Sequence, residues 1–217
     1  MNHVPFTIAQ KRPIRSGMTI SRPAELGKEV PVTWFSMGAG TSITPESYDC
    51  TTLYLGAEGA GDFLLGPNRQ PVPMHPYDLL MVSPRTLCGT QTDSGLIYTE
   101  IILKKENCNM NNLIKAGQPA ALKDLISYEE GSIANLDIVH ADNMKFVLMA
   151  FDEGTGLTPH RAHGNAILTA LEGKAIIGYE GQDYELNAGE SFRFDKNGLH
   201  SVTPVGRFKM SLLLVIE

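Results

Sequence analysis

Short runs of β-branched and aromatic residues recur along the chain, interrupted about every eight to twelve residues by Gly, Pro, Asn or Asp. The clearest runs are residues 145–151, 166–171, 174–179, 190–194 and 208–216. This rhythm is typical of an all-β sandwich or barrel, because each run is long enough for one strand and each interruption supplies turn residues.

One segment departs from the strand pattern. Within residues 118–128, Leu122, Leu125 and Ile126 recur at helical spacing behind a proline near the start, which predicts a short inter-domain helix. The polar, Asn-rich stretch of residues 104–117 precedes it and indicates a link between two domains. The predicted domains are residues 1–109 and residues 110–217.

The chain is an internal repeat. A shift of 114 positions places Gly17 on Gly131 without a gap, and it also aligns Gly40, Thr41, Thr44, Pro45, Glu58 and Gly59 with Gly154, Thr155, Thr158, Pro159, Glu172 and Gly173. After a deletion, residues 77–89 lie over 189–201, and residues 95–103 over 207–215. Two copies of one β unit therefore make up the chain. We expect positive φ angles at Gly40, Gly59, Gly154 and Gly173, where the strand pattern breaks.

The composition and charge of the chain exclude several classes of function. The 217 residues are 42% hydrophobic, enough for one large core or two small ones, and the formal charge of −6 disfavours nucleic acid as a partner. No apolar run is long enough for a signal peptide or a membrane span, so we expect a cytoplasmic protein without a membrane partner. Three cysteines, Cys50, Cys88 and Cys108, lack CxxC spacing and indicate neither a disulfide framework nor a cysteine-based zinc site. Sequence motifs for nucleophilic hydrolysis, phosphate binding and dinucleotide cofactors are absent.

The second copy carries two short motifs. Gly154 is followed after five residues by His160, and Leu171, Glu172 and Gly173 close the first motif. The second motif runs from Gly189 to His200. In these two motifs the second copy resembles the cupin family. The resemblance covers most of residues 118–217 and implies a double-stranded β-helix, a jelly-roll barrel whose mouth holds a ligand or metal. The first copy resembles the fold through its match to the second, so the whole chain is expected to be a bicupin.

The resemblance implies a divalent metal site in the C-terminal barrel only. Cupins of this kind supply two histidines and a carboxylate or Gln from the first motif and a histidine from the second, and His160 and His200 match the first and last ligands. Ala162 stands where the second histidine belongs, and His163 lies one residue out of register, where a bulge at Gly164 would bring it back. The predicted ligands are therefore His160, His163 and His200, with Asn165 assisting, for Zn, Fe, Ni, Cu or Mn. The alternative is a metal-free pocket in which these histidines only form hydrogen bonds.

The first copy carries different residues at the matching positions. Glu46 lies over His160, Tyr48 over Ala162, Asp49 over His163 and Cys88 over His200. This mixed set indicates a ligand pocket that lost its metal, with Glu46, Tyr48 and Cys88 lining it.

Two classes of function follow from the resemblance. The first is a small-molecule-binding bicupin with a metal in its second half and no assigned catalysis. The alternative is a metal-dependent dioxygenase or isomerase that acts on a small polar or carbonyl-bearing substrate. The expected assembly is a monomer that mimics a cupin dimer, or a homodimer.

Overall fold

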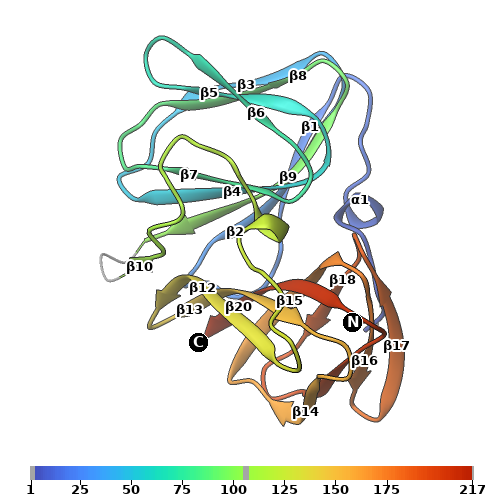
Figure 1. The fold of residues 1–217 in the computed structure, drawn as a ribbon. Coiled ribbons are helices and arrows are strands. Elements are labelled where there is room, and N and C mark those ends of the chain that lie inside the picture. The colour runs from blue at the N-terminus through green and yellow to red at the C-terminus, as the bar shows by residue number, and fades with distance from the viewer. Residues whose placement is uncertain (1–2, 105–107, 217) are drawn as a thin grey trace. The chain divides into compact units, whose positions relative to one another are not determined.

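The computed structural model describes residues 3–104 and 108–216, which divide into two compact units. The N-terminal barrel comprises Ile8–Cys108 and Asn112–Ala121. The C-terminal barrel comprises Met1–Thr7, Asn109–Asn111 and Leu122–Glu217. Each unit contains a six-stranded and a four-stranded antiparallel sheet that enclose its core, which confirms the predicted all-β architecture of two barrels (Figure 1).

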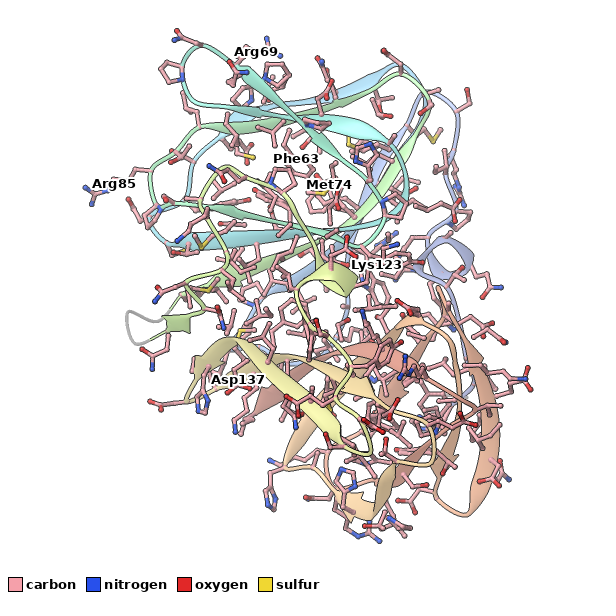
Figure 2. The ribbon with its side chains drawn as sticks, viewed as in Figure 1. Phe63, Arg69, Met74, Arg85, Lys123 and Asp137 are labelled. Carbon is pink, nitrogen blue, oxygen red and sulfur yellow. The ribbon has the colours of Figure 1, made fainter. Side chains whose placement is uncertain are left out.

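The large sheet of the N-terminal barrel has the order β1 (Thr19–Pro23), β2 (Val32–Met37), β9 (Leu96–Leu103), β4 (Thr51–Gly59), β7 (Asp78–Val82) and β11 (Ala120–Ala121). Its small sheet has the order β3 (Thr41–Glu46), β8 (Cys88–Thr92), β5 (Gly61–Leu65) and β6 (Gln70–Met74). A four-residue helix, α1 (Ile8–Lys11), precedes β1. Phe63 and Met74 point into the space between the two sheets and are fully buried there (Figure 2).

The large sheet of the C-terminal barrel has the order β10 (Asn109–Met110), β12 (Ile133–Ala141), β13 (Met144–Phe151), β20 (Phe208–Ile216), β15 (Gly164–Glu172) and β18 (Ser191–Phe194). Its small sheet has the order β14 (Leu157–Arg161), β19 (Leu199–Pro204), β16 (Lys174–Tyr179) and β17 (Gln182–Asn187). Aromatic side chains fill much of its core, namely Phe151, Tyr179, Phe192, Phe194 and Phe208.

The two barrels repeat one another down to single irregularities. Pairing of β4 with β9 slips between Gly56 and Glu58, and pairing of β15 with β20 slips between Ala170 and Glu172. The four glycines expected at positive φ have it, with φ between 70° at Gly40 and 79° at Gly154. At Gly59 a Cβ would also lie 2.1 Å from the carbonyl oxygen of Gly95, so glycine is required there for space as well.

The predicted inter-domain helix is wrong. Within residues 118–128 the chain forms β11 and then a single turn of 3-10 helix, η1 (Leu122–Asp124). Ala120 and Ala121 pair with Leu79 and Asp78 of β7, so hydrogen bonding to a sheet edge overrides the local helical spacing. Leu122 and Ile126 are nevertheless buried, which explains why their spacing resembled one face of a helix.

A short segment covers the same sheet edge in each barrel, and it comes from the other copy of the repeat. Phe6 bridges Ser191 of β18, with N–H···O distances of 2.9 Å and 2.7 Å in the two directions. In the N-terminal barrel, Ala120 bridges Leu79 of β7 in the corresponding way. The repeat shift that relates Gly17 to Gly131 also relates Phe6 to Ala120. Neither barrel is therefore completed by its own copy of the repeat alone.

No helix among the described residues is long and apolar enough to cross a membrane. 

The edge segment yields a prediction for stability. Phe6 is 7% exposed, so Phe6→Ala should lower the free energy of unfolding of the C-terminal barrel by about 3 kcal/mol through lost burial and a cavity. Thermal unfolding followed by circular dichroism measures the change. Val4→Ala is the matched control, because Val4 is 46% exposed in the same segment and should cost little. Equal effects of the two substitutions would contradict a role for this segment in closing the barrel.

Candidate functional site

The two motif strands of each barrel bring the same pair of positions together. In the C-terminal barrel β14 pairs with β19, and His160 lies directly opposite His200. In the N-terminal barrel β3 pairs with β8, and Glu46 lies directly opposite Cys88. The small sheet thus places one chemically distinct pair at the corresponding point of each barrel.

The imidazoles of His160 and His200 face each other, with ring centroids 4.3 Å apart. The Nδ1 atom of His160 lies 2.8 Å from the carbonyl oxygen of Thr158, and that of His200 lies 2.9 Å from the carbonyl oxygen of Gly198. A carbonyl oxygen only accepts hydrogen bonds, so Nδ1 carries the proton in both rings. In the neutral form this tautomer leaves both Nε2 lone pairs available, which is the arrangement that metal-binding histidines use.

The surroundings of His200 favour its neutral form. His200 is 5% exposed, and its ring stacks on Phe194 at 4.2 Å between centroids. Burial lowers the pKa of His200, and the neighbouring His160 lowers it further, although the hydrogen bond to Gly198 opposes the shift. A buried neutral imidazole next to an exposed one, His160, is a donor pair ready to accept a cation.

Three successive backbone amides of the turn that precedes His200 donate hydrogen bonds to neighbouring segments. The amide nitrogen of Asp195 donates to the Tyr179 hydroxyl at 3.3 Å, that of Lys196 donates to the Asn165 side-chain oxygen at 2.9 Å, and that of Asn197 donates to the carbonyl oxygen of Ala162 at 2.8 Å. Asn165, predicted to assist a metal, therefore positions the turn that carries the Gly198 carbonyl.

His163 lies in the bend between β14 and β15, where it is exposed. Gly164 begins β15, and a Cβ there would lie 2.1 Å from the carbonyl oxygen of Val215. Close approach of β20 therefore explains this glycine without a bulge that redirects His163. Among the described residues, no three His, Cys, Asp or Glu side chains are grouped to hold a metal ion. His160 and His200 are therefore brought together as a pair, and the metal site with His163 as a third ligand stays a prediction.

A shallow groove of about 220 Å³ lies beside β16 and β19, lined by residues that include Gly178, Glu180 and Ser201. Strand alternation places Gly178 and Ser201 on the face opposite to the buried Ile177 and Val202. The groove lies against the outer face of the small sheet, and His200, one of the two paired histidines, also belongs to its lining.

The N-terminal barrel holds a buried polar cluster, made of Tyr48, Tyr54, Cys88, Tyr98 and Glu100. Glu100 is 7% exposed and lies opposite Tyr54 in the pairing of β9 with β4. The Tyr48 hydroxyl donates to a Glu100 carboxylate oxygen at 3.5 Å. Asp49 is not part of this cluster, because its side chain is exposed and forms an ion pair with Arg85 at 3.1 Å.

Burial is the largest cause of the raised pKa values in this cluster. It raises the pKa of Glu100, against the opposing effect of the tyrosine hydrogen bonds, and the Glu46 carboxylate raises it further. Burial also raises the pKa of Cys88 to about 11 and that of Tyr48 to about 12. The thiol and the phenol therefore stay protonated at neutral pH.

Comparison with known proteins agrees with this geometry. Residues 147–216 match the Cupin_2 family, described as a cupin domain. This segment contains both His160 and His200. The C-terminal barrel is a cupin domain.

Solved structures extend the likeness to both barrels. A cupin 2 conserved barrel domain protein from Leptotrichia buccalis is 23% identical with a TM-score of 0.84, over 97% of this chain and 95% of that one. A salicylate 1,2-dioxygenase from Pseudaminobacter salicylatoxidans is 12% identical with a TM-score of 0.65, over 98% of this chain and 84% of that one. No curated protein matches the chain. At these identities the structures show a shared fold, the two-barrel cupin fold, for the whole chain.

Two features of this chain escaped the sequence interpretation. Glu100, Tyr54 and Tyr98 belong to no motif, but Leu96, Tyr98 and Glu100 alternate on the core-facing side of β9, and a carboxylate on such a face is the signal that was available. His3 is half-buried, with its ring 4.6 Å from that of Tyr179 and its Nε2 atom 3.3 Å from Asp195. It supports the turn before His200, and only the edge segment brings it there.

The raised pKa of Glu100 gives a pH-dependent prediction. The folded cupin holds this proton more tightly than the unfolded chain, so stability falls as pH rises from the ordinary glutamate range through the raised pKa, and the whole cost is present above it. Glu100→Gln should therefore raise the Tm at neutral pH, by about 2–4 °C if the cost is about 1 kcal/mol. The gain should vanish near pH 4. Glu58→Gln, an exposed change on the neighbouring β4, is the control, and a gain that is independent of pH would contradict the assignment.

Proposed function

We propose that this chain is a small-molecule-binding bicupin whose C-terminal barrel holds a divalent metal ion between His160 and His200. The observation that supports the proposal most directly is the shared tautomer of the two rings, since each Nδ1 proton is committed to a backbone carbonyl. Neutral imidazoles suit Zn, Fe, Cu and Ni, and the order of affinities does not select among them.

The role of the metal in this proposal is to bind the small molecule. Two protein ligands leave coordination positions for water and for an oxygen or nitrogen atom of the ligand. A bound divalent ion would supply a Lewis acid that polarises a carbonyl or carboxylate of that ligand. Asn165 and Ala166 occupy the region in which a cupin carboxylate is expected, so we propose binding rather than turnover.

Burial and neighbouring groups support His200 as the more rigid of the two ligands. Phe194 stacks on its ring, and the turn at residues 195–198 fixes the carbonyl that orients it. His160 is exposed and more accessible to solvent. In this proposal His200 sets the position of the metal, and His160 completes the pair from the edge strand β14.

Zinc titration of the full chain tests the metal site. His160→Ala or His200→Ala should weaken zinc binding by more than about a hundredfold, since removing a ligand costs more than removing its hydrogen-bond partner. Isothermal titration calorimetry measures the affinity. His140→Ala is the matched control, because His140 is an exposed histidine of the same barrel, with 51% of its side chain accessible. Unchanged affinity in both site variants would refute the proposed metal site.

A further variant tests whether His163 is a metal ligand. In the bend that the structure describes, His163→Ala should change zinc affinity less than tenfold. A loss as large as that of His160→Ala would show instead that the bend rearranges and that three histidines bind the metal, as the sequence predicted. Cys88→Ala, in the other barrel, should leave zinc binding unchanged.

A further inference from the structure

The N-terminal edge segment, residues 3–7, brings a histidine to the C-terminal barrel. Phe6 pairs with β18, and the same segment places His3 beside the end of that strand. The Nδ1 atom of His3 lies 3.3 Å from the carbonyl oxygen of Arg193, and its Nε2 atom lies 3.3 Å from a carboxylate oxygen of Asp195. A carbonyl and a carboxylate only accept hydrogen bonds, so each ring nitrogen of His3 faces an acceptor.

Asp195 and Tyr179 connect His3 to the turn that precedes His200. The amide nitrogen of Asp195 donates to the Tyr179 hydroxyl at 3.3 Å, and the ring centroids of His3 and Tyr179 are 4.6 Å apart. Gly198 packs on the same phenol, so closely that a Cβ there would lie 2.6 Å from the hydroxyl oxygen. The Gly198 carbonyl in turn lies 2.9 Å from Nδ1 of His200. One continuous series of contacts therefore joins His3 to the ring of His200.

The N-terminal barrel has an equivalent edge segment without the histidine. The repeat shift relates His3 to Gly117, and the Gly117 amide nitrogen donates to the carbonyl oxygen of Met81 at 2.8 Å. Met81 is the equivalent of Arg193 in the repeat. The two segments therefore approach the same strand position, one through the His3 side chain and the other through its backbone.

The residue beside each segment differs as well. Tyr179 lies opposite His200 in the pairing of β16 with β19, and Leu65 has the equivalent place in the pairing of β5 with β8. A Cβ at Gly117 would lie 3.5 Å from Leu65, so a side chain there would contact it as His3 contacts Tyr179. The barrel with the imidazole pair thus has polar groups between its edge segment and its turn, where the other barrel has glycine and leucine.

Attachment of the segment does not depend on these polar contacts. Phe6 is buried and forms two backbone hydrogen bonds with Ser191, which already attach the segment to β18. The side chain of His3 is 22% exposed and adds less burial. Its contacts are directed at the turn that precedes His200.

We propose that His3 is a positioning residue for the candidate metal centre, an inference that rests on the proposed metal site. His3 holds Asp195 and Tyr179 in place, these residues hold the turn, and the Gly198 carbonyl of the turn orients the ring of His200. His3 is not itself grouped with the two paired histidines as a metal-binding set among the described residues. A segment from the first copy of the repeat thereby prepares the site in the second copy.

The first test observes His200 in the zinc-free full chain by nitrogen-15 NMR at neutral pH. Correlation of the ring nitrogens with the carbon-bound ring protons shows which nitrogen carries the proton. The wild-type ring should have its proton on Nδ1 alone. His3→Ala should give a mixture of both tautomers, because the turn no longer holds the Gly198 carbonyl in place. An unchanged His200 spectrum in His3→Ala overturns the proposal.

Two further substitutions separate positioning from a general loss of stability. His3→Gln keeps N–H groups that can donate to Arg193 and Asp195, so it should restore the wild-type tautomer of His200. Val4→Ala changes an exposed neighbour in the same segment and should leave the spectrum as it is. Circular dichroism verifies that each variant remains folded. Equal effects of His3→Ala and Val4→Ala, or a failure of His3→Gln to restore the tautomer, overturn the assignment to the His3 hydrogen bonds.

Zinc titration of the same variants connects the positioning to the metal site. His3→Ala should weaken zinc binding about tenfold, because groups that orient a metal-binding histidine typically contribute about ten- to a hundredfold to affinity. His3→Gln should recover most of the loss. A loss as large as that of His160→Ala would show that His3 is itself a ligand, and it would overturn the positioning role.

The two proposals fail separately. Absence of zinc binding in the wild-type chain would refute the metal site, and the NMR test of the zinc-free chain would still decide whether His3 orients His200. A His200 tautomer that changes in His3→Ala without any change in zinc affinity would overturn the link between His3 and metal binding.

Discussion

The antiparallel pairing of the two motif strands determines which side chains meet at each candidate site. β14 and β19 set His160 opposite His200, and β3 and β8 set Glu46 opposite Cys88. A slip of one residue in either pair would turn these side chains to the other face of the strand. The turn before β19 fixes this register, and its equivalent before β8 is held by the same kind of bond, from the amide nitrogen of Arg85 to the carbonyl oxygen of Tyr48 at 2.7 Å.

The two barrels share this strand register but differ in the side chains of their cores. Aromatic side chains fill much of the C-terminal barrel, where Phe194 stacks on His200 and His200 in turn contacts the exposed His160. The N-terminal barrel keeps the same strands but places tyrosines, a thiol and a carboxylate among its core residues. Because both sets of side chains are compatible with the same backbone fold, the fold alone does not explain why they differ. The two barrels therefore present chemically different side chains at equivalent positions.

Much of the fold was predictable from the sequence. The gap-free alignment of Gly17–Gly59 with Gly131–Gly173 predicted equivalent strands, and the structure places matching bulges and positive φ angles along it. The alignment also predicted that Glu46 and Cys88 correspond to the two histidines. These successes depend on local pattern and on turn residues, which a sequence displays directly.

The missed features depend on contacts between distant segments. Residues 118–128 have helical spacing, but their alanines pair with β7, an edge that local spacing does not reveal. Phe6 and His3 lie against β18 and Tyr179, more than 170 positions away in the chain. Glu100 was missed because a motif search passes over a single carboxylate in an apolar strand. Only the structure brings it beside Tyr48 and Tyr54.

In the proposed arrangement the two copies of one barrel carry different sites, and only the second binds a metal. The most direct measurement is the metal content of the full chain, prepared without a metal-affinity tag, incubated with zinc and freed of excess by gel filtration. The account predicts one zinc ion per chain by elemental analysis. Two ions per chain, or none, would contradict it.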